Sequence, residues 1–133
     1  MTKTILAVLS AWHGLNGIVM LAMPVRWYET VPGVTHTGPF NGHFIADIAI
    51  AFLASAIGLA LAAFRSGSAS AAFMAAPAVF LGGHAVLHAV EFFHGHLNAY
   101  EVIRDTATII VPGLLPALLA LRIFQYQTRG AAT

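Results

Sequence analysis

Four long runs of apolar residues dominate this chain. A helix needs roughly 20 consecutive apolar residues to cross the hydrocarbon core of a bilayer, and four such runs use nearly all of the 133 residues. The mean hydropathy of +0.81 and a charged fraction of only 8% are far from the values of a soluble domain. The sequence therefore predicts one all-α domain over residues 1–133, an integral membrane four-helix bundle.

Breaks in the apolar runs set the expected boundaries of the spans. Pro24 ends the first run, because proline fits poorly inside a helix, and the segment RSGSAS separates the second run from the third. Pro112 and Pro116 should bend the fourth span and leave carbonyl groups such as that of Thr108 without a helical donor. We expect the spans at residues 3–23, 41–64, 71–93 and 102–124.

The connection after the first span is rich in proline and glycine. Residues 24–42 include three prolines and three glycines, which predicts a segment too irregular for a helix or a strand. Trp27 and Tyr28 suit the aromatic belt at a membrane interface. Asn41 suits the N-cap of the second span, and it is a candidate cofactor contact because this connection can cover a site.

The basic residues predict the orientation in the membrane. Arg26 and Arg104 lie near one side, whereas the larger group lies on the other: Lys3, Arg65, Arg122 and Arg129. Because basic residues accumulate on the cytoplasmic side, we expect both termini in the cytoplasm and the protein in a bacterial inner membrane.

The remaining ionisable residues gather in the opposite half of the membrane. At about 1.5 Å per helical residue, all five acidic residues and six of the seven histidines fall there. An ionisable residue inside a span costs roughly 2.5–3.5 kcal/mol on insertion scales, so such residues normally face the bundle interior and pair with one another. Several of them at one depth predict a shared site.

Helical spacing places these residues on one face of each span. Residues three or four apart lie on the same side of a helix. Each span therefore presents a polar group: His13 with Asn16, His43 with Asp47, His84 with His88 and Glu91, and Asp105 with Thr108.

This set favours a transition-metal site, with zinc, copper or iron as the ion. Imidazole and carboxylate are usual ligands of these metals, and helix bundles present them at three- and four-residue spacing. The chain has no cysteine, and histidines outnumber acids, which favours zinc or copper over a di-iron pair. The expected ligands are His43, Asp47, His84 and His88, with Glu91, Asp105 and His13 as further ligands or as groups that orient them.

Four other interpretations stay open. A b-type haem can bind between His13 and His84 or between His43 and His88, with Asn16 as a further contact. A metal-free imidazole and carboxylate site can act as general acid and base on a lipophilic substrate that enters from the bilayer. The polar residues can form a proton or ion pathway. They can also simply join helices in a structural subunit, through hydrogen bonds worth about 0.6 kcal/mol each.

Composition also limits the partners. A formal net charge of +1 from six basic residues excludes nucleic-acid binding, which depends on the neutralisation of many phosphates. The expected partners are the lipid bilayer, a lipophilic small molecule, and further copies of this chain or other subunits of a membrane complex.

Two stretches carry a resemblance to a known group. RWYETVPGVTHTGPFNGHFIAD, followed later by GGHAVLHAVEFF, resembles small four-span integral membrane proteins of bacteria that are functionally uncharacterised. The resemblance covers most of the chain. It implies the four-span topology and no particular activity, cofactor or substrate.

Overall fold

The computed structural model describes residues 2–94 and 97–130, and nearly all of them are helical. Four segments are long and apolar enough to cross a membrane, which confirms the helical, four-span part of the prediction. They are α1 (Thr2–Ala22), α3 (Gly42–Phe64), α4 (Gly67–Phe93) and a continuous segment, Ala99–Tyr126, made of α5 (Ala99–Asp105), the π-helical η2 (Thr106–Ile110) and most of α6 (Val111–Gly130).

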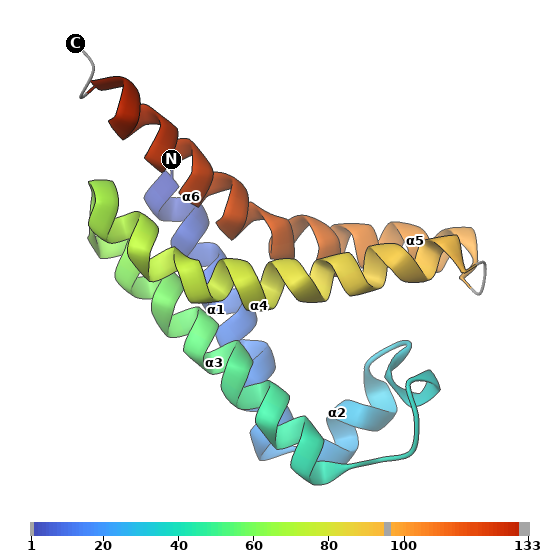
Figure 1. The fold of residues 1–133 in the computed structure, drawn as a ribbon. Coiled ribbons are helices and arrows are strands. Elements are labelled where there is room, and N and C mark those ends of the chain that lie inside the picture. The colour runs from blue at the N-terminus through green and yellow to red at the C-terminus, as the bar shows by residue number, and fades with distance from the viewer. Residues whose placement is uncertain (1, 95–96, 131–133) are drawn as a thin grey trace.

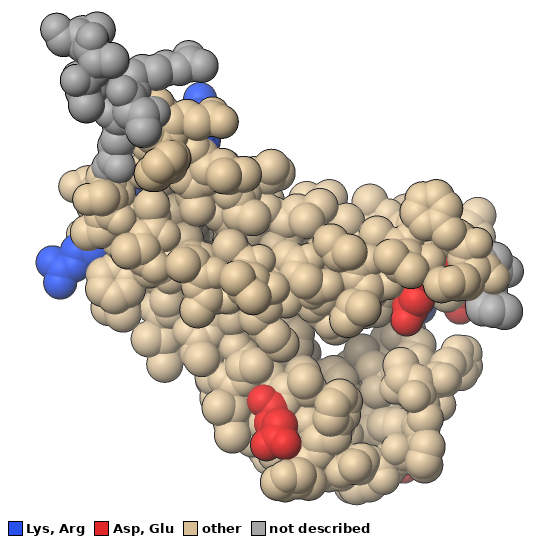
Figure 2. Space-filling model, viewed as in Figure 1, with Lys and Arg blue, Asp and Glu red and all other residues tan. Residues whose placement is uncertain are grey.

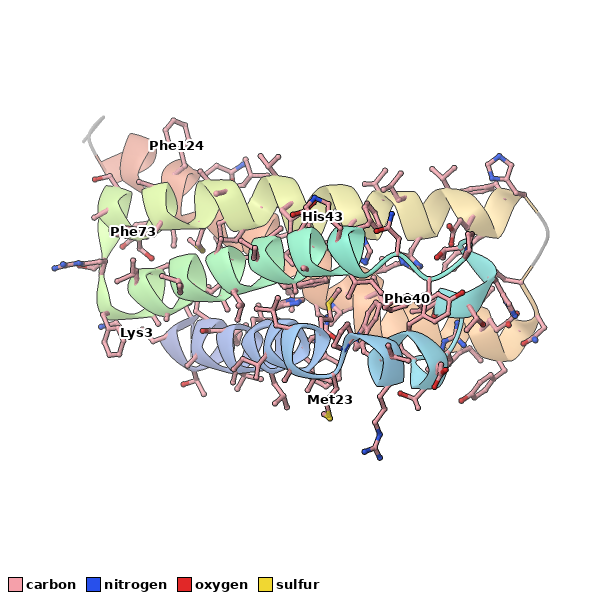
Figure 3. The ribbon with its side chains drawn as sticks, turned by 90° about the horizontal axis from the view of Figure 1, so that it is seen from below. Lys3, Met23, Phe40, His43, Phe73 and Phe124 are labelled. Carbon is pink, nitrogen blue, oxygen red and sulfur yellow. The ribbon has the colours of Figure 1, made fainter. Side chains whose placement is uncertain are left out.

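The spans form two helix pairs that diverge (Figure 1). α1 packs along α3, and α4 packs along η2 and α6, while α3 and α4 touch near their connection. Both ends of the chain lie at the end where the pairs meet. Figure 3 shows Lys3, Phe73 and Phe124 toward this end, and Phe40 toward the end where the pairs separate. The bundle is therefore open at the end remote from the termini.

Glycines set the distance between neighbouring helices. A β carbon on Gly58 of α3 would lie 2.8 Å from the carbonyl oxygen of Phe73 in α4, and one on Gly113 of α6 would lie 2.6 Å from that of Leu81. Gly17 makes the same kind of contact between α1 and α3. Small residues at such crossings let backbones approach closely, which is how helices gain packing energy in a membrane.

Large apolar side chains cover the outside of the molecule as well as its core. Leu6, Leu59 and Met74 are almost fully buried, whereas Val79 and Phe64 are 78% and 82% exposed. Apolar side chains on both the inner and the outer faces of a helix are typical of a segment surrounded by lipid. The distribution agrees with the four apolar spans.

The connection after α1 contains a short helix, α2 (Pro24–Thr30), so the prediction of an irregular segment is wrong over these residues. A proline is tolerated in the first turn of a helix, where its missing N–H group has no helical partner. The indole Nε1 of Trp27 donates a hydrogen bond of 3.0 Å to Asn16 of α1. The Tyr28 hydroxyl donates one of 2.7 Å to the Gly38 carbonyl. The first bond joins α2 to α1, and the second joins α2 to the connection that follows it.

Two other spans differ from the prediction by more than one residue: the fourth span runs over Ala99–Tyr126 instead of residues 102–124, and α4 begins early. α4 begins at Gly67, four residues early, because the serine and alanine residues after Arg65 continue into the helix. The fourth span departs from α-helical geometry at η2, directly before Pro112. A proline lacks the N–H group of a regular turn, and a π-helical turn is one way for the backbone to accommodate it.

Gly113→Ala should lower the free energy of unfolding by about 1–3 kcal/mol, because its β carbon would press against the Leu81 carbonyl oxygen and the Ala85 side chain in a packed interface. Titration of the protein in mixed micelles with SDS, followed by circular dichroism, measures this change. Gly83→Ala in α4 is the matched control, because that position faces open space. Equal destabilisation by both substitutions would contradict the role of Gly113.

Candidate functional site

His88 of α4 is the centre of the polar contacts in the part of the bundle remote from the termini. Its Nδ1 atom lies 3.5 Å from Oδ2 of Asp105 and 3.6 Å from Oε2 of Glu91. Both distances are too long for a good hydrogen bond, and Nδ1 is buried without a hydrogen-bond partner. We refer to His84, His88, Glu91, Arg104 and Asp105 as the His88 site.

Asp105 is the most deeply buried acid of the His88 site, with 3% of its surface exposed. It ends α5, directly before η2, and its Oδ1 atom accepts a hydrogen bond of 2.6 Å from Nε of Arg104. The other oxygen, Oδ2, faces His88. The Asp105 carboxylate therefore links a guanidinium on one side to an imidazole on the other, and Arg104 fixes its orientation.

The charges of the His88 site do not cancel. With neutral imidazoles, the two carboxylates and the one guanidinium sum to −1. The Glu91 side chain is 55% exposed, so part of this charge is screened, whereas only 4% of the Asp105 side chain is exposed. A cation bound beside Asp105 and Glu91 would complete the charge balance.

His84 lies one helical turn before His88 in α4, and aromatic side chains contact its ring. The two imidazole rings have centroids 4.8 Å apart. Phe80 stacks on His84 at 6.3 Å, and Phe52 of α3 meets it edge to face at 5.8 Å. These contacts join the α4 side of the site to α3, at the point where the two helix pairs begin to diverge.

His13 of α1 also contacts the Phe52 ring. The two rings stack with centroids 5.7 Å apart, and His13 is 5% exposed. Its Nε2 atom is buried without a hydrogen bond, and the Pro112 carbonyl, which Pro116 leaves without its helical N–H donor, lies toward the ring. The predicted partner Asn16 contacts Trp27 and Met20 instead.

The structure leaves His43 and Asp47 as a separate pair on α3. His43 Nε2 lies 3.4 Å from Asp47 Oδ2, and the two side chains are 90% and 59% exposed. Asn41 is the N-cap of α3, because its side chain accepts a hydrogen bond from the Phe44 N–H group. This confirms the capping role, and the contribution of Asn41 to a cofactor site stays a prediction. Thr108 bonds the Arg104 carbonyl through its own hydroxyl.

The sequence predicted one shared site. The structure divides its residues into three groups: the His88 site, His13, and the pair formed by His43 and Asp47. Within residues 2–94 and 97–130, no three or more His, Cys, Asp and Glu side chains are arranged so that they could hold a metal ion. The predicted ligand set of His43, Asp47, His84 and His88 is not assembled in this conformation. Its metal stays a prediction, and so does a haem at any of the histidines.

Sequence reasoning also missed contributors to the site. Arg104 was counted only for orientation, yet it bonds Asp105, and the adjacency of an arginine and an aspartate was the available signal. Gly33, in the connection after α2, has φ = 90° and lies beside Arg104, where a β carbon would be 3.5 Å from Nη2. The connection thus reaches across to α5. Figure 2 shows a hollow between the two diverging helix pairs, with acidic atoms at its edge.

No protein-family model, no curated protein and no solved structure matches this chain. Any function therefore has to be argued from the geometry of its own residues.

Asp105→Asn should destabilise the protein by about 1–3 kcal/mol, because the substitution removes the charge that faces Arg104 Nε and weakens a buried interaction. Unfolding in mixed micelles measures the loss. Asp47→Asn is the matched control and should change stability by less than about 0.5 kcal/mol, because both members of its pair are largely exposed. A silent Asp105→Asn would show that the buried contact contributes little.

Proposed function

We propose that this protein is an integral membrane protein whose His88 site binds a transition-metal ion, with zinc or copper preferred. The observation that carries the proposal is the buried Nδ1 atom of His88, which has no hydrogen bond and faces two carboxylate oxygens at 3.5 and 3.6 Å. Two ligands on one tetrahedral zinc ion, with bonds of about 2.0–2.1 Å, lie about 3.4 Å apart. The spacing suits ligands that share an ion better than a hydrogen bond.

Charge and neighbouring groups support the same proposal. With neutral imidazoles the site sums to −1, and His84, at a ring separation of 4.8 Å, supplies a second imidazole. Asp105 is already oriented by Arg104, as ligands are commonly held by an outer contact. Glu91 already lies 3.6 Å from His88 Nδ1, and its half-exposed side chain has room to adjust its position around an ion.

The proposed site lies toward the side of the membrane opposite the termini. Figure 2 shows basic atoms near the end that carries the termini, and acidic atoms toward the other end. In the sequence, Lys3 lies at the start of α1, Arg65 directly follows α3, and Arg122 lies in the C-terminal half of α6. By the positive-inside rule, we propose both termini in the cytoplasm of a bacterial cell, with the His88 site in the outer half of the inner membrane.

A second candidate function follows from the order of contacts through Asp105. Arg104 holds the carboxylate, and the carboxylate faces Nδ1 of His88. An acid that positions one nitrogen of an imidazole leaves the other nitrogen available for proton transfer. In a site beside a hollow between apolar helices, this arrangement suits acid–base chemistry on a lipophilic molecule that enters from the bilayer.

The metal proposal predicts that wild-type protein purified without added metal contains zinc or copper, and that His88→Ala binds Zn²⁺ at least about 10-fold more weakly. Elemental analysis measures the first quantity, and isothermal titration calorimetry measures the second. Zn²⁺ at 100 times its dissociation constant should also raise the free energy of unfolding by about 2.7 kcal/mol.

His43→Ala is the matched control, because it removes an imidazole of α3 that lies outside the His88 site. It should leave Zn²⁺ affinity unchanged. Equal loss of affinity in both variants would point instead to a ligand set that includes α3. No metal and no Zn²⁺ binding in the wild type would refute the proposal, and a Soret band in the visible spectrum would favour haem.

The second candidate predicts that metal-free protein carries a defined lipophilic molecule. Mass spectrometry of an organic extract of freshly purified protein should identify it in the wild type and find it depleted in His88→Ala. His43→Ala should retain it. The same mixture of membrane lipids in all three samples would count against a substrate site.

A further inference from the structure

A groove separates α1 from α6 in the half of the bundle that carries the termini. α1 packs along α3 and α6 packs along α4, whereas α1 and α6 contact each other only slightly. The space between them has a volume of about 210 Å³ and is lined by Thr4, Ile5, Val8, Leu9 and Leu115. We refer to these five residues as the α1–α6 groove.

The lining of the α1–α6 groove is apolar and reaches the outer surface of the protein. Four of the five lining residues are aliphatic. Leu9 is 6% exposed, whereas Val8 is 62% exposed, so the groove extends from the core to the surface of the spans. Both helices belong to segments that are apolar enough to cross a membrane. Because the groove is smaller than the roughly 300–1,000 Å³ of a pocket for a drug-sized molecule, it suits part of a hydrocarbon chain.

Basic residues flank the end of the α1–α6 groove that is nearer the termini. Lys3 directly precedes Thr4, and Arg122 lies about two helical turns beyond Leu115 on the same face of α6. Both basic side chains are exposed. Figure 3 shows Lys3 toward the end that carries the termini, where α1 begins and α6 ends. The two cations therefore lie at one end of the groove.

The charge beside the α1–α6 groove selects between possible occupants. All five acidic residues of the chain lie outside α1 and α6, so these helices carry basic residues alone. A molecule with a negative group at the membrane surface and an apolar chain below it complements both the cations and the groove. A second copy of this chain complements only the groove, because a symmetric contact would bring the same basic residues together.

We infer that the α1–α6 groove binds an anionic phospholipid, with part of an acyl chain in the groove and the headgroup phosphate beside Lys3 and Arg122. Long basic side chains near the end of a span reach the headgroup layer while their stems stay against apolar surface. The inference requires that the helices span a bilayer, and it does not depend on a metal ion or a reaction elsewhere in the protein.

Native mass spectrometry in a neutral detergent tests the charge preference, with phosphatidylglycerol as the probe and phosphatidylcholine of the same acyl chains as the neutral comparison. The wild type should prefer phosphatidylglycerol by about 5-fold for each basic residue that contacts the headgroup. In Lys3→Gln/Arg122→Gln this preference should disappear. Arg26→Gln is the matched control and should keep the wild-type preference, because Arg26 lies in α2, outside the groove.

Phosphatidylglycerol with a photoreactive group in its acyl chain tests the position of the lipid. In bilayers that also contain phosphatidylcholine, the labelled residues should concentrate on α1 and α6 around the groove, as peptide mass spectrometry identifies them. Val8→Trp, which fills the groove, should remove this labelling. Val79→Trp is the matched control and should retain it, because Val79 is a 78% exposed residue of α4 outside the groove.

Three results would overturn the inference. Equal affinity of the wild type for the two lipids would show that the basic residues do not bind the headgroup. Even labelling of all four spans would show an ordinary lipid layer around the protein. A dimer that Val8→Trp dissociates would show that the groove is an interface between copies of this chain.

Discussion

The close approach of helix backbones at glycines determines how the rest of this molecule is arranged. Gly17 brings α1 against α3, Gly58 brings α3 against α4, and Gly113 brings α6 against α4. In a membrane, lipid tails solvate apolar side chains as well as protein does, so helices associate through this kind of close packing and through a few polar bonds. The Gly58 contact joins α3 to α4 and so connects the two helix pairs, which diverge toward the end remote from the termini (Figure 1).

The grouping of the polar residues follows from that arrangement of the helices. Where α4 and α5 stay together, Asp105, His88 and Arg104 form a connected group. Where α3 diverges from α4, His43 and Asp47 pair with each other, and both side chains are largely exposed. The ring of Phe52 connects α3 to this group, because it contacts His84 edge to face. The site is thus confined to one helix pair.

The periodicity of the sequence was sufficient to predict the helices and part of the site. The same-face relation of His84, His88 and Glu91 depends only on spacing within one helix, so it could be predicted, as could the cap at Asn41. The grouping across helices could not, because depth along a span does not specify rotation about its axis or the angle between helix pairs. His43 and His88 have similar predicted depths and separate environments. Nor does hydropathy reveal that Pro24 begins a helix.

The π-helical segment η2 has a consequence for the phase of the fourth span. A π turn contains one residue more than the α turn it replaces, and one residue corresponds to about 100° of rotation about the helix axis. η2 lies between Asp105 and Gly113. It therefore changes the rotation of α5, which faces His88, relative to α6, which packs on α4. In an uninterrupted α-helix of the same residues, Thr106 would occupy the angular position of Asp105. The polarity of the group opposite the imidazole is thus set by a single extra residue in the backbone.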